Sequence, residues 1–252
     1  MTTSLPVNTS LPMNTLPMNT PAVLRAQIEA RIPAAFATTK RPQYKFIPTG
    51  VEQIDCLTGG IPLGALTEIC GSQVAYSGKT SVLLSLLAQA TREGRFCALV
   101  DGGDAFDPVS GQAAGVGFSH LLWVRCGKTR QKLKPLEQAF KVADILMQSA
   151  GFGLVVVDVS NFPEPFVRRV PLTTWFRFSR VVEKQPTALV FIECKPHATS
   201  CAGLVLLVKS RPPVWTGNLL TQCNVEVEVV RAYEKKPAHS VRPSFSLNAQ
   251  WA

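Results

Sequence analysis

An apolar run, a loop that ends in Gly-Lys-Thr and an unbroken apolar helical stretch follow one another between residues 66 and 90. This order predicts a strand, a phosphate-binding loop and a helix. Backbone N–H groups at the start of such a helix attract an anion, a lysine reaches the terminal phosphates, and a Thr80 hydroxyl can ligate Mg²⁺. A nucleoside triphosphate is therefore the first candidate ligand. The candidate binding residues in this stretch are Gly71, Ser77, Gly78, Lys79, Thr80 and Ser81.

The spacing of the two glycines differs from the usual phosphate-loop pattern. Six residues separate Gly71 from Gly78, whereas the regular motif, Gly-x-x-x-x-Gly-Lys-Ser/Thr, would place its first glycine at Gln73. The loop is therefore either longer than usual or closed without its first glycine. The alternative is a chance Gly-Lys-Thr in a surface turn, and the flanking strand and helix argue against it.

Apolar runs alternate with helical segments from Phe46 onward. Apolar strands separated by helices predict an α/β fold with a mostly parallel sheet that helices cover on both faces. The predicted strands are Leu66–Cys70, Cys97–Val100, Leu121–Val124, Leu154–Val159 and Ala188–Ile192, and the predicted helices include Lys134–Ala150 and Thr174–Glu183.

The end of this core has a different pattern. Leu204–Lys209 and Val225–Val230 are β-rich but are not separated by a helical pattern. Pro212–Pro213 and Gly217 interrupt the connection between them. We expect an antiparallel addition to the sheet, with Ser244–Leu247 as a last edge strand.

The domain organisation follows from these patterns. Residues 1–21 contain a tandem repeat with a proline every five or six residues, which predicts a disordered tail. Residues 22–45 hold an N-terminal helix, expected over Pro21–Ile32, and a linker. Residues 46–233 form the nucleotide-binding core, and residues 234–252 form a basic, proline-punctuated C-terminal extension.

A second element of a nucleotide site follows the strand Leu154–Val157. This apolar run ends in Asp158, so a carboxylate is expected at the carboxyl edge of a buried parallel strand, beside the phosphate loop. Asp158 is therefore the second candidate Mg²⁺ ligand, with Thr80. An aspartate that merely caps a strand is the alternative, and Lys79 and Thr80 upstream favour the metal role.

The net charge of +9 comes from 26 Lys and Arg residues against 17 Asp and Glu residues. Such a balance favours phosphate-rich partners, although a basic surface that only keeps the chain soluble is the alternative. The seven cysteines contain no Cys-x-x-Cys pair, which indicates reduced core thiols and not a disulfide framework or a zinc site. No apolar stretch approaches a membrane span and no signal peptide is recognisable, so a cytoplasmic location is expected.

Two basic segments are candidates for DNA binding. Arg125–Lys134 places five cations in ten residues without an acid, as in a phosphate-contacting loop or in the solvated start of a helix. Arg168–Arg180 interleaves arginines with aromatic residues, a mixture that grips single strands but also fits core aromatics beside solvated arginines. The candidate DNA-binding residues are Lys128, Arg130, Lys132, Lys134, Arg168, Arg169, Arg177 and Lys195. No histidine spacing or nucleophile constellation suggests a metal site or covalent catalysis.

Further motifs surround the loop in a fixed order. They are Thr49–Asp55 and Gly59–Gly64 ahead of it, Ser77–Thr80 within it, and Cys97–Pro108 and Leu154–Asp158 after it. The string Asp-x-x-x-Ala-x-Asp-Pro inside the fourth segment is more specific than the loop alone. In these motifs the chain resembles bacterial RecA-family proteins over about residues 46–247.

The resemblance implies a RecA-like P-loop fold that binds ATP with Mg²⁺. It also implies work in DNA repair and recombination, binding to single-stranded DNA and assembly into a homo-oligomer or filament. By matching position, Asp107 would lie near the adenine, and Arg231 would resemble a cation that reaches the nucleotide of a neighbouring subunit.

Departures from the family pattern qualify this expectation. Recombinases position the attacking water with a glutamate where this chain has Gly103, and Asp104 would have to be re-aimed to replace it. They sense the γ-phosphate with an Asn-Gln pair where this chain has Glu193 and Cys194. Because positioning and charge stabilisation supply nearly all phosphoryl-transfer catalysis, we expect ATP binding with at most weak DNA-dependent hydrolysis, and no catalytic residue is assigned.

The segment after the Glu193 strand is also too short for a long DNA-binding loop, and the chain ends soon after its core, without the large C-terminal domain of bacterial RecA. These features resemble ImuA-type RecA relatives, which are thought to support translesion synthesis in the SOS response. That resemblance implies the alternative function, a non-catalytic adaptor for a translesion DNA polymerase or for RecA.

Overall fold

The computed structural model describes residues 21–31, 45–72, 77–127, 134–149, 151–232 and 244–248. The chain divides into two units, Met1–Gln43 and Tyr44–Ala252. The described part of the first unit is one helix, α1 (Pro21–Arg31), which buries none of its residues. The helix predicted over Pro21–Ile32 is thus confirmed up to Arg31, and the repeat tail lies outside the described residues.

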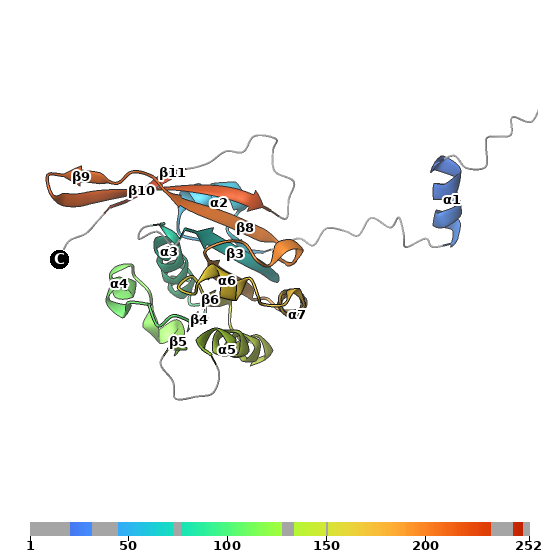
Figure 1. The fold of residues 1–252 in the computed structure, drawn as a ribbon, viewed down its shortest axis with the longest axis horizontal. Helices are drawn as coiled ribbons and strands as arrows, with labels where there is room; N and C mark the ends of the chain where they lie inside the picture. Colours follow the sequence, from blue (N-terminus) through green and yellow to red (C-terminus); the bar gives the residue numbers. More distant parts are fainter. Residues whose placement is uncertain are drawn as a thin grey trace, which may run out of the picture. The chain divides into compact units, whose positions relative to one another are not determined.

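A nine-stranded sheet forms the centre of the second unit (Figure 1). Its order is β11-β10-β8-β3-β7-β6-β4-β5, with β9 paired to β10. The six strands from β8 to β5 are parallel, and β9, β10 and β11 are added antiparallel. The strands are β3 (Ala65–Gly71), β4 (Cys97–Asp101), β5 (Leu121–Arg125), β6 (Leu154–Asp158), β7 (Ala188–Glu193), β8 (Leu204–Ser210), β9 (Val214–Thr216), β10 (Leu219–Arg231) and β11 (Ser244–Asn248). The predicted α/β fold with a mostly parallel sheet and an antiparallel extension is confirmed.

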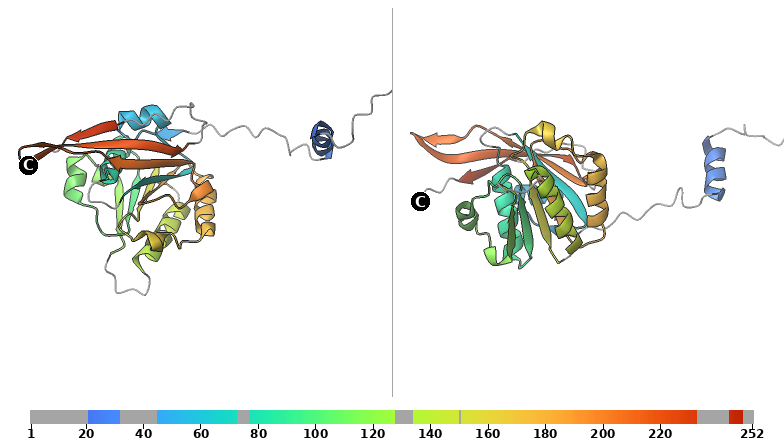
Figure 2. Two further views of the ribbon diagram at one scale, coloured as in Figure 1. Left: turned by 45° about the horizontal axis from the view of Figure 1, so that its top comes forward. Right: turned by 60° about the horizontal axis from the view of Figure 1, so that its bottom comes forward.

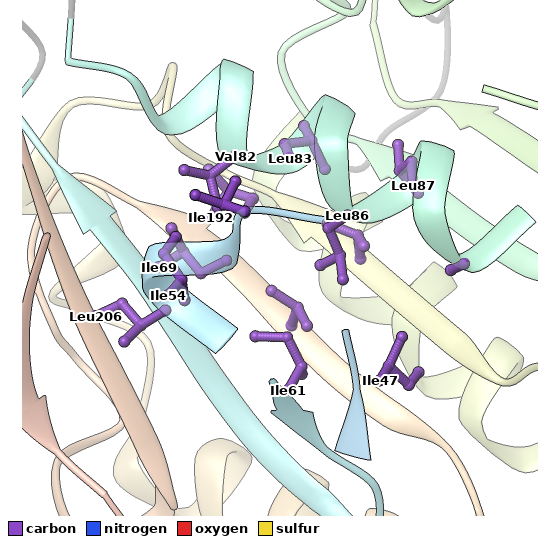
Figure 3. Packing of buried hydrophobic residues seen from close by; sticks show 14 of the residues in the cluster. Ile47, Ile54, Ile61, Ile69, Val82, Leu83, Leu86, Leu87, Ile192 and Leu206 are labelled. Atoms are coloured by element: carbon purple, nitrogen blue, oxygen red, sulfur yellow. The ribbon is translucent and has the colours of Figure 1, made fainter. Parts of the chain in front are cut away.

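Helices cover both faces of this sheet (Figure 2). On one face α3 (Lys79–Arg92) packs against β3 and β4, and on the other α5 (Pro135–Ser149) and α7 (Leu172–Val182) pack against β3, β4 and β6. Every residue of β3, β4 and β7 is buried, which explains why their sequences are largely apolar, with Thr67 and Glu68 of β3 as buried polar exceptions. Figure 3 shows Val82 of α3 beside Ile192, and Ile69, Ile192 and Leu206 of three neighbouring strands belong with Val82 and Leu86 to one buried cluster.

Shorter elements complete the unit. They are the two-stranded sheet of β1 (Phe46–Ile47) and β2 (Ile61–Pro62), the helices α2 (Glu52–Thr58), α4 (Pro108–Ala113) and α6 (Glu164–Val167), and the 3₁₀ turns η2 (Phe118–His120) and η3 (Thr199–Cys201). None of the helices in the described parts of the chain combines the length and apolar character needed to cross a bilayer.

The connection between β8 and β10 differs from the prediction. Pro212–Pro213 lies between β8 and β9, and Gly217, with φ +61°, forms the turn of a β9–β10 hairpin. The prolines therefore interrupt only the edge, where no ladder bond is required of them. As a result β10 begins six residues before the predicted start at Val225. β11 pairs with β10, so the sheet continues into the C-terminal extension.

The carboxyl ends of β3, β7, β6 and β4 lie along one edge of the sheet. The chain leaves β3 toward α3 on one face, and it leaves β7 toward η3, which contacts α7 on the other face. Connections that diverge in this way open a crevice at the strand ends, which is where ligands of open α/β sheets bind. The described ends of the predicted phosphate loop, Gly71 and Ser77–Thr80, lie at this crevice.

Candidate nucleotide site

Two glycines shape the beginning and the end of the loop. Gly71 ends β3, and a Cβ atom there would lie 2.8 Å from the Lys79 Cγ and 2.8 Å from the Val208 carbonyl oxygen. Gly78 precedes α3 with φ +81°, and a Cβ atom there would lie 2.7 Å from a Val225 methyl group. Larger residues fit neither position. Gln73, where the regular motif would place a glycine, lies outside the described residues.

The start of α3 is suited to an anion. Its N-cap, Gly78, offers no side chain for capping, and the Ser77 hydroxyl lies 3.5 Å from the Lys79 N–H. The first N–H groups of a helix lack intrahelical partners and carry partial positive charge. Thr80 is exposed and Ser81 half-buried, so the Thr80 hydroxyl is accessible to a metal ion.

Lys79 is buried, with 7% of its surface exposed. Its Nζ lies 3.8 Å from the Sγ of Cys194, and that thiol donates to the carbonyl oxygen of Ser160 at 3.0 Å. The ammonium is therefore held at the carboxyl end of β7 by a weak sulfur contact. A phosphate would be a far stronger partner at this position.

Asp158 ends β6 at the same edge, in register with Asp101 of β4 and Ile192 of β7. Its Oδ1 accepts the Ser160 N–H at 2.9 Å. Burial raises the pKa of Asp158, the Asp101 carboxylate adds to the rise, and the Lys79 ammonium opposes it. A divalent cation would compensate this buried charge, and oxygen donors such as Thr80 and Asp158 are those that Mg²⁺ prefers. The residues present therefore fit a Mg²⁺–nucleotide.

The end of β4 is organised differently. Asp101 is buried, and its two oxygens accept the N–H groups of Ala105 and Phe106 at 2.9 Å and the indole N–H of Trp123 at 3.3 Å. This carboxylate fixes the segment 102–106 and is fully engaged with the protein. It is therefore no candidate for a metal ligand, although it stands beside Asp158.

The space around Gly103 is filled. A Cβ atom at Gly103 would lie 2.7 Å from the Cβ and 2.8 Å from the Nδ2 of Asn161. The neighbouring Gly102 donates its N–H to the Asp158 carbonyl oxygen at 3.0 Å. The turn after β6 therefore occupies the place from which a longer side chain at position 103 would extend.

Asp104 does not replace the missing carboxylate. It has φ +54°, and its carboxylate accepts both the Nε and Nη2 of Arg125, at 2.6 and 3.0 Å. The Arg125 guanidinium in turn lies 5.1 Å from the Trp123 ring centroid. The Asp104 side chain is therefore directed toward the end of β5, where the Arg125 guanidinium binds both of its carboxylate oxygens.

The two residues assigned by resemblance have local roles in the structure. Asp107 caps α4 by accepting the N–H groups of Val109 and Ser110 and the Ser110 hydroxyl, and these bonds, that of the hydroxyl first, lower its pKa. Arg231 donates to the Thr199 carbonyl oxygen at 2.7 Å. It also pairs with Val205 at the start of β8, which is the end of that strand remote from the phosphate loop of this chain. Contact of Asp107 with adenine and contact of Arg231 with the nucleotide of a neighbouring subunit both remain predictions.

The candidate DNA-binding residues are only partly described. Lys128, Arg130 and Lys132 lie outside the described residues, and Lys195 forms an ion pair with Glu164 at 3.8 Å. In the second basic segment Trp175 and Phe178 are buried in the core, as the alternative interpretation expected. Arg168 and Arg169 follow α6 and are exposed. Lys134, Arg169 and Arg177 line one pocket between α5, α6 and α7.

A buried cluster below the loop was missed by sequence reasoning. Glu68 of β3 accepts the N–H groups of His197 and Ala198 at 2.6 and 2.7 Å, and Glu193 Oε2 lies 2.5 Å from His197 Nδ1. Burial raises the pKa of Glu68 and raises that of Glu193 to about 7, and the bond to Glu193 raises the pKa of His197. These contacts hold the short segment that carries Cys194. A glutamate inside the apolar run of β3 was the available signal.

The same residues match known proteins. A family profile described as the RecA N-terminal domain matches residues 34–165, which is more than half of the chain. The chain belongs to the RecA family. It is 40% identical over 100 residues to Protein RecA of Ectopseudomonas oleovorans, which is 40% of this chain and 26% of that protein. It is also 40% identical over 114 residues to Protein RecA of Methylococcus capsulatus, 44% of this chain and 30% of that protein.

The matches therefore span less than a third of the length of these RecA relatives. The segment covered by the family profile begins before β1 and ends within α6, so it includes the loop, α3, the Gly103 region and Asp158. The RecA resemblance inferred from the motifs is thus confirmed at the level of the family.

Proposed function

We propose that this RecA-family protein binds ATP with Mg²⁺ at the carboxyl edge of β3, β7 and β6 and works in DNA repair and recombination, in an SOS-type damage response. The observation that carries the proposal is the meeting of a buried Lys79 with Asp158 at one crevice, beside a helix start without a side-chain cap. A cytoplasmic location and assembly into a homo-oligomer or filament belong to the same proposal.

The roles of the residues follow from their chemistry. Gly71 and Gly78 let the loop approach the phosphates, the N–H groups at the start of α3 bind their oxygens, and Lys79 neutralises the terminal phosphate. Thr80 and Asp158 would hold Mg²⁺ directly or through water. Bound there, Mg²⁺ would supply neutralisation of the phosphate charge.

Single-stranded DNA is the proposed nucleic-acid partner. The net charge of +9 supplies the general attraction, and exposed Arg168 at the end of α6 supplies a cation outside the pocket that Arg169 lines. Lys195 is a weaker candidate for DNA binding, because its ammonium already forms an ion pair with Glu164.

A second candidate function is a non-catalytic adaptor for a translesion DNA polymerase or for RecA. The specific observation is that Asn161 occupies the space next to Gly103 while Arg125 binds Asp104. No carboxylate at the end of β4 is left to position an attacking water. ATP would then be bound as a structural or regulatory ligand and hydrolysed weakly or not at all.

The nucleotide site is tested by titrating a fluorescent ATP analogue into the wild type, Lys79→Ala and the surface control Lys184→Ala. Loss of a charged partner of the phosphates should weaken binding roughly ten- to a hundredfold in Lys79→Ala, and Lys184→Ala should bind like the wild type. Equal binding by the wild type and Lys79→Ala would sink the proposed site.

The two candidate functions are separated by ATPase measurement with and without single-stranded DNA. The adaptor function predicts binding of ATP with little turnover under both conditions. Robust turnover stimulated by single-stranded DNA would exclude the adaptor, and absence of DNA binding even at low salt would exclude the DNA-binding function.

A further inference from the structure

A pocket of about 760 Å³ lies between α5, α6 and α7, on the face of the sheet opposite to α3. Its floor is apolar and includes Leu136, Phe140, Phe162 and Val170. The volume falls within the roughly 300–1,000 Å³ of specific ligand pockets. We call this pocket the α5–α7 groove.

The floor of the α5–α7 groove is fixed by the core beneath it. The ring of Phe140 packs edge-on against Trp175, with centroids 5.4 Å apart, and lies 5.6 Å from Phe191 of β7. The ring of Phe162 lies so close to Gly102 that a Cβ atom there would be 2.8 Å from its Cε2. A pre-formed apolar floor needs little ordering when a ligand binds.

One end of the groove is closed by an ion pair. Arg177 of α7 and Asp144 of α5 lie 3.4 Å apart and join the two helices across it. These two charges therefore satisfy each other and add little to the recognition of a ligand.

The rest of the rim is basic. Lys134 and Lys141 stand on the α5 side and Arg169 on the α6 side, where its guanidinium lies 5.9 Å from the Phe166 ring centroid. Glu137 is the one further carboxylate among the described rim residues. Phe166 itself is 51% exposed and forms an apolar lip. The groove thus presents apolar depth under an excess of positive charge.

We propose that the α5–α7 groove binds a short acidic peptide segment of a partner protein. Apolar side chains of the peptide would fill the floor, and its carboxylates would face Lys134, Lys141 and Arg169. Glu137 lies between the two lysines on the α5 side, so a continuous phosphate backbone would meet a like charge there. A polypeptide can place a neutral residue at that point, which favours a peptide over single-stranded DNA.

This surface is separate from the phosphate loop, and the inference stands whether or not the protein binds ATP. It gives the adaptor function the docking surface it requires. Phe162 of the groove floor follows Asp158 by four residues and packs against Gly102. A bound peptide would therefore contact the turn that follows β6, whose first residue after the strand is next to Asp158.

The test uses the full chain and a phage-displayed library of random short peptides. Selection should enrich peptides that combine aromatic or aliphatic residues with Asp or Glu. Synthetic versions of these peptides should bind at least about tenfold more weakly to Phe166→Ala and Arg169→Glu, which remove an apolar anchor and reverse a rim charge.

Two variants on the neighbouring helix are matched controls. Phe176→Ala removes an aromatic ring of similar exposure, 46%, and Arg180→Glu reverses an exposed charge, yet neither residue lines the groove. Both should bind the peptides like the wild type. Thermal unfolding checks that each variant is folded, and Lys141→Glu on α5 replaces Arg169→Glu if that variant is not.

Several results would overturn the proposal. These are a selection without any acidic and apolar consensus, selected peptides that bind the groove variants as tightly as the wild type, or controls that weaken binding equally. Displacement of the peptides by an oligo-dT strand whose own affinity falls in the groove variants would assign the groove to single-stranded DNA. ATP-analogue binding by the same variants should stay unchanged, which separates this test from that of the nucleotide site.

Discussion

The ends of β3 and β4 lie at the same edge of the sheet but offer different chemistry. At the end of β3, Gly71, Gly78 and Lys79 leave room for a phosphate and hold a cation toward it. At the end of β4, Gly103 is covered by Asn161 and Asp104 is bound by Arg125. One end is open to a ligand, and the other is closed by protein groups.

Under the proposed function, nucleotide binding and water activation would depend on separate parts of this edge. The phosphate-binding half rests on backbone geometry and on residues within a single strand–loop–helix unit. The water-activating half needs a carboxylate from a different strand, and the turn after β6 occupies its place. A chain can therefore retain the first while the second is blocked.

The largest effect is expected from Gly78→Ala. Alanine is strained at φ +81°, and its Cβ would press on Val225, so we expect a loss of about 2–4 kcal/mol of stability, with loss of ATP binding. Gly94→Ala is the matched control, because Gly94 has φ +74° but no atom within 4 Å of an added Cβ. Urea unfolding and nucleotide titration of both variants measure the difference. An equal loss in both would mean that the Val225 contact is unimportant.

A pH dependence is expected from the cluster that holds the Cys194 segment. The pKa of Glu193 is raised from 4.5 to about 7 and that of His197 is also raised, so the folded state binds more protons than the unfolded state across this range. Stability should therefore fall as the pH rises from about 5 to 8, by about 2–3 kcal/mol for Glu193.

Glu193→Gln should flatten this pH profile in urea unfolding. At pH 8 the variant should keep more of its pH 5 stability than the wild type, because no buried carboxylate ionises at that position. Glu183→Gln, at an exposed position, is the control and should leave the profile unchanged. Parallel profiles for the wild type and Glu193→Gln would contradict the role of the cluster.

A glutamate introduced at position 103, at the end of β4, should not raise ATP turnover unless the space that Asn161 fills is vacated. Gly103→Glu alone should lose about 1–2 kcal/mol through overpacking against Asn161 and gain no ATPase activity. Gly103→Glu with Asn161→Gly should recover stability and raise ATP turnover above the wild type. Equal turnover in both variants would show that Asn161 is not what blocks this end.

The smallest effect is expected from Asp104→Asn. The carboxylate pairs with an exposed arginine, and asparagine tolerates positive φ, so thermal unfolding should change little. ATP binding and hydrolysis should both stay at wild-type levels. A marked loss of turnover would instead assign Asp104 a part in the reaction and weaken the contrast between the two strand ends.

Most of the parallel part of the sheet was predictable because β3, β4, β6 and β7 are buried on both faces, whereas β5 at the edge is half-exposed but still apolar over Leu121–Val124. Each predicted strand from Leu66–Cys70 to Ala188–Ile192 lies within one residue of an observed one at either end, since an apolar run that is covered on both sides leaves a continuous signal. The placement of Asp158 at the carboxyl edge followed from the same pattern and is confirmed by its register with Asp101.

Other features depend on contacts between distant residues. The cluster of Glu68, Glu193 and His197 joins positions more than a hundred residues apart, and periodicity gives no account of such pairing. The fit of Asn161 against Gly103 is likewise a tertiary contact. The β9–β10 hairpin was missed because Pro212–Pro213 was taken to end the strand, whereas prolines at an edge leave the partner strand intact.

The contact between Val225 and Gly78 limits how the chain can vary. In β10, Val225 and Val227 are fully buried while Glu226 is paired with Arg211 on the opposite face. A shift of β10 by one residue would present the Glu226 carboxylate, in place of valine methyl groups, to a loop suited to anions. A single insertion or deletion in this strand should therefore be tolerated poorly, even though Val225 itself is no proposed ligand of the nucleotide.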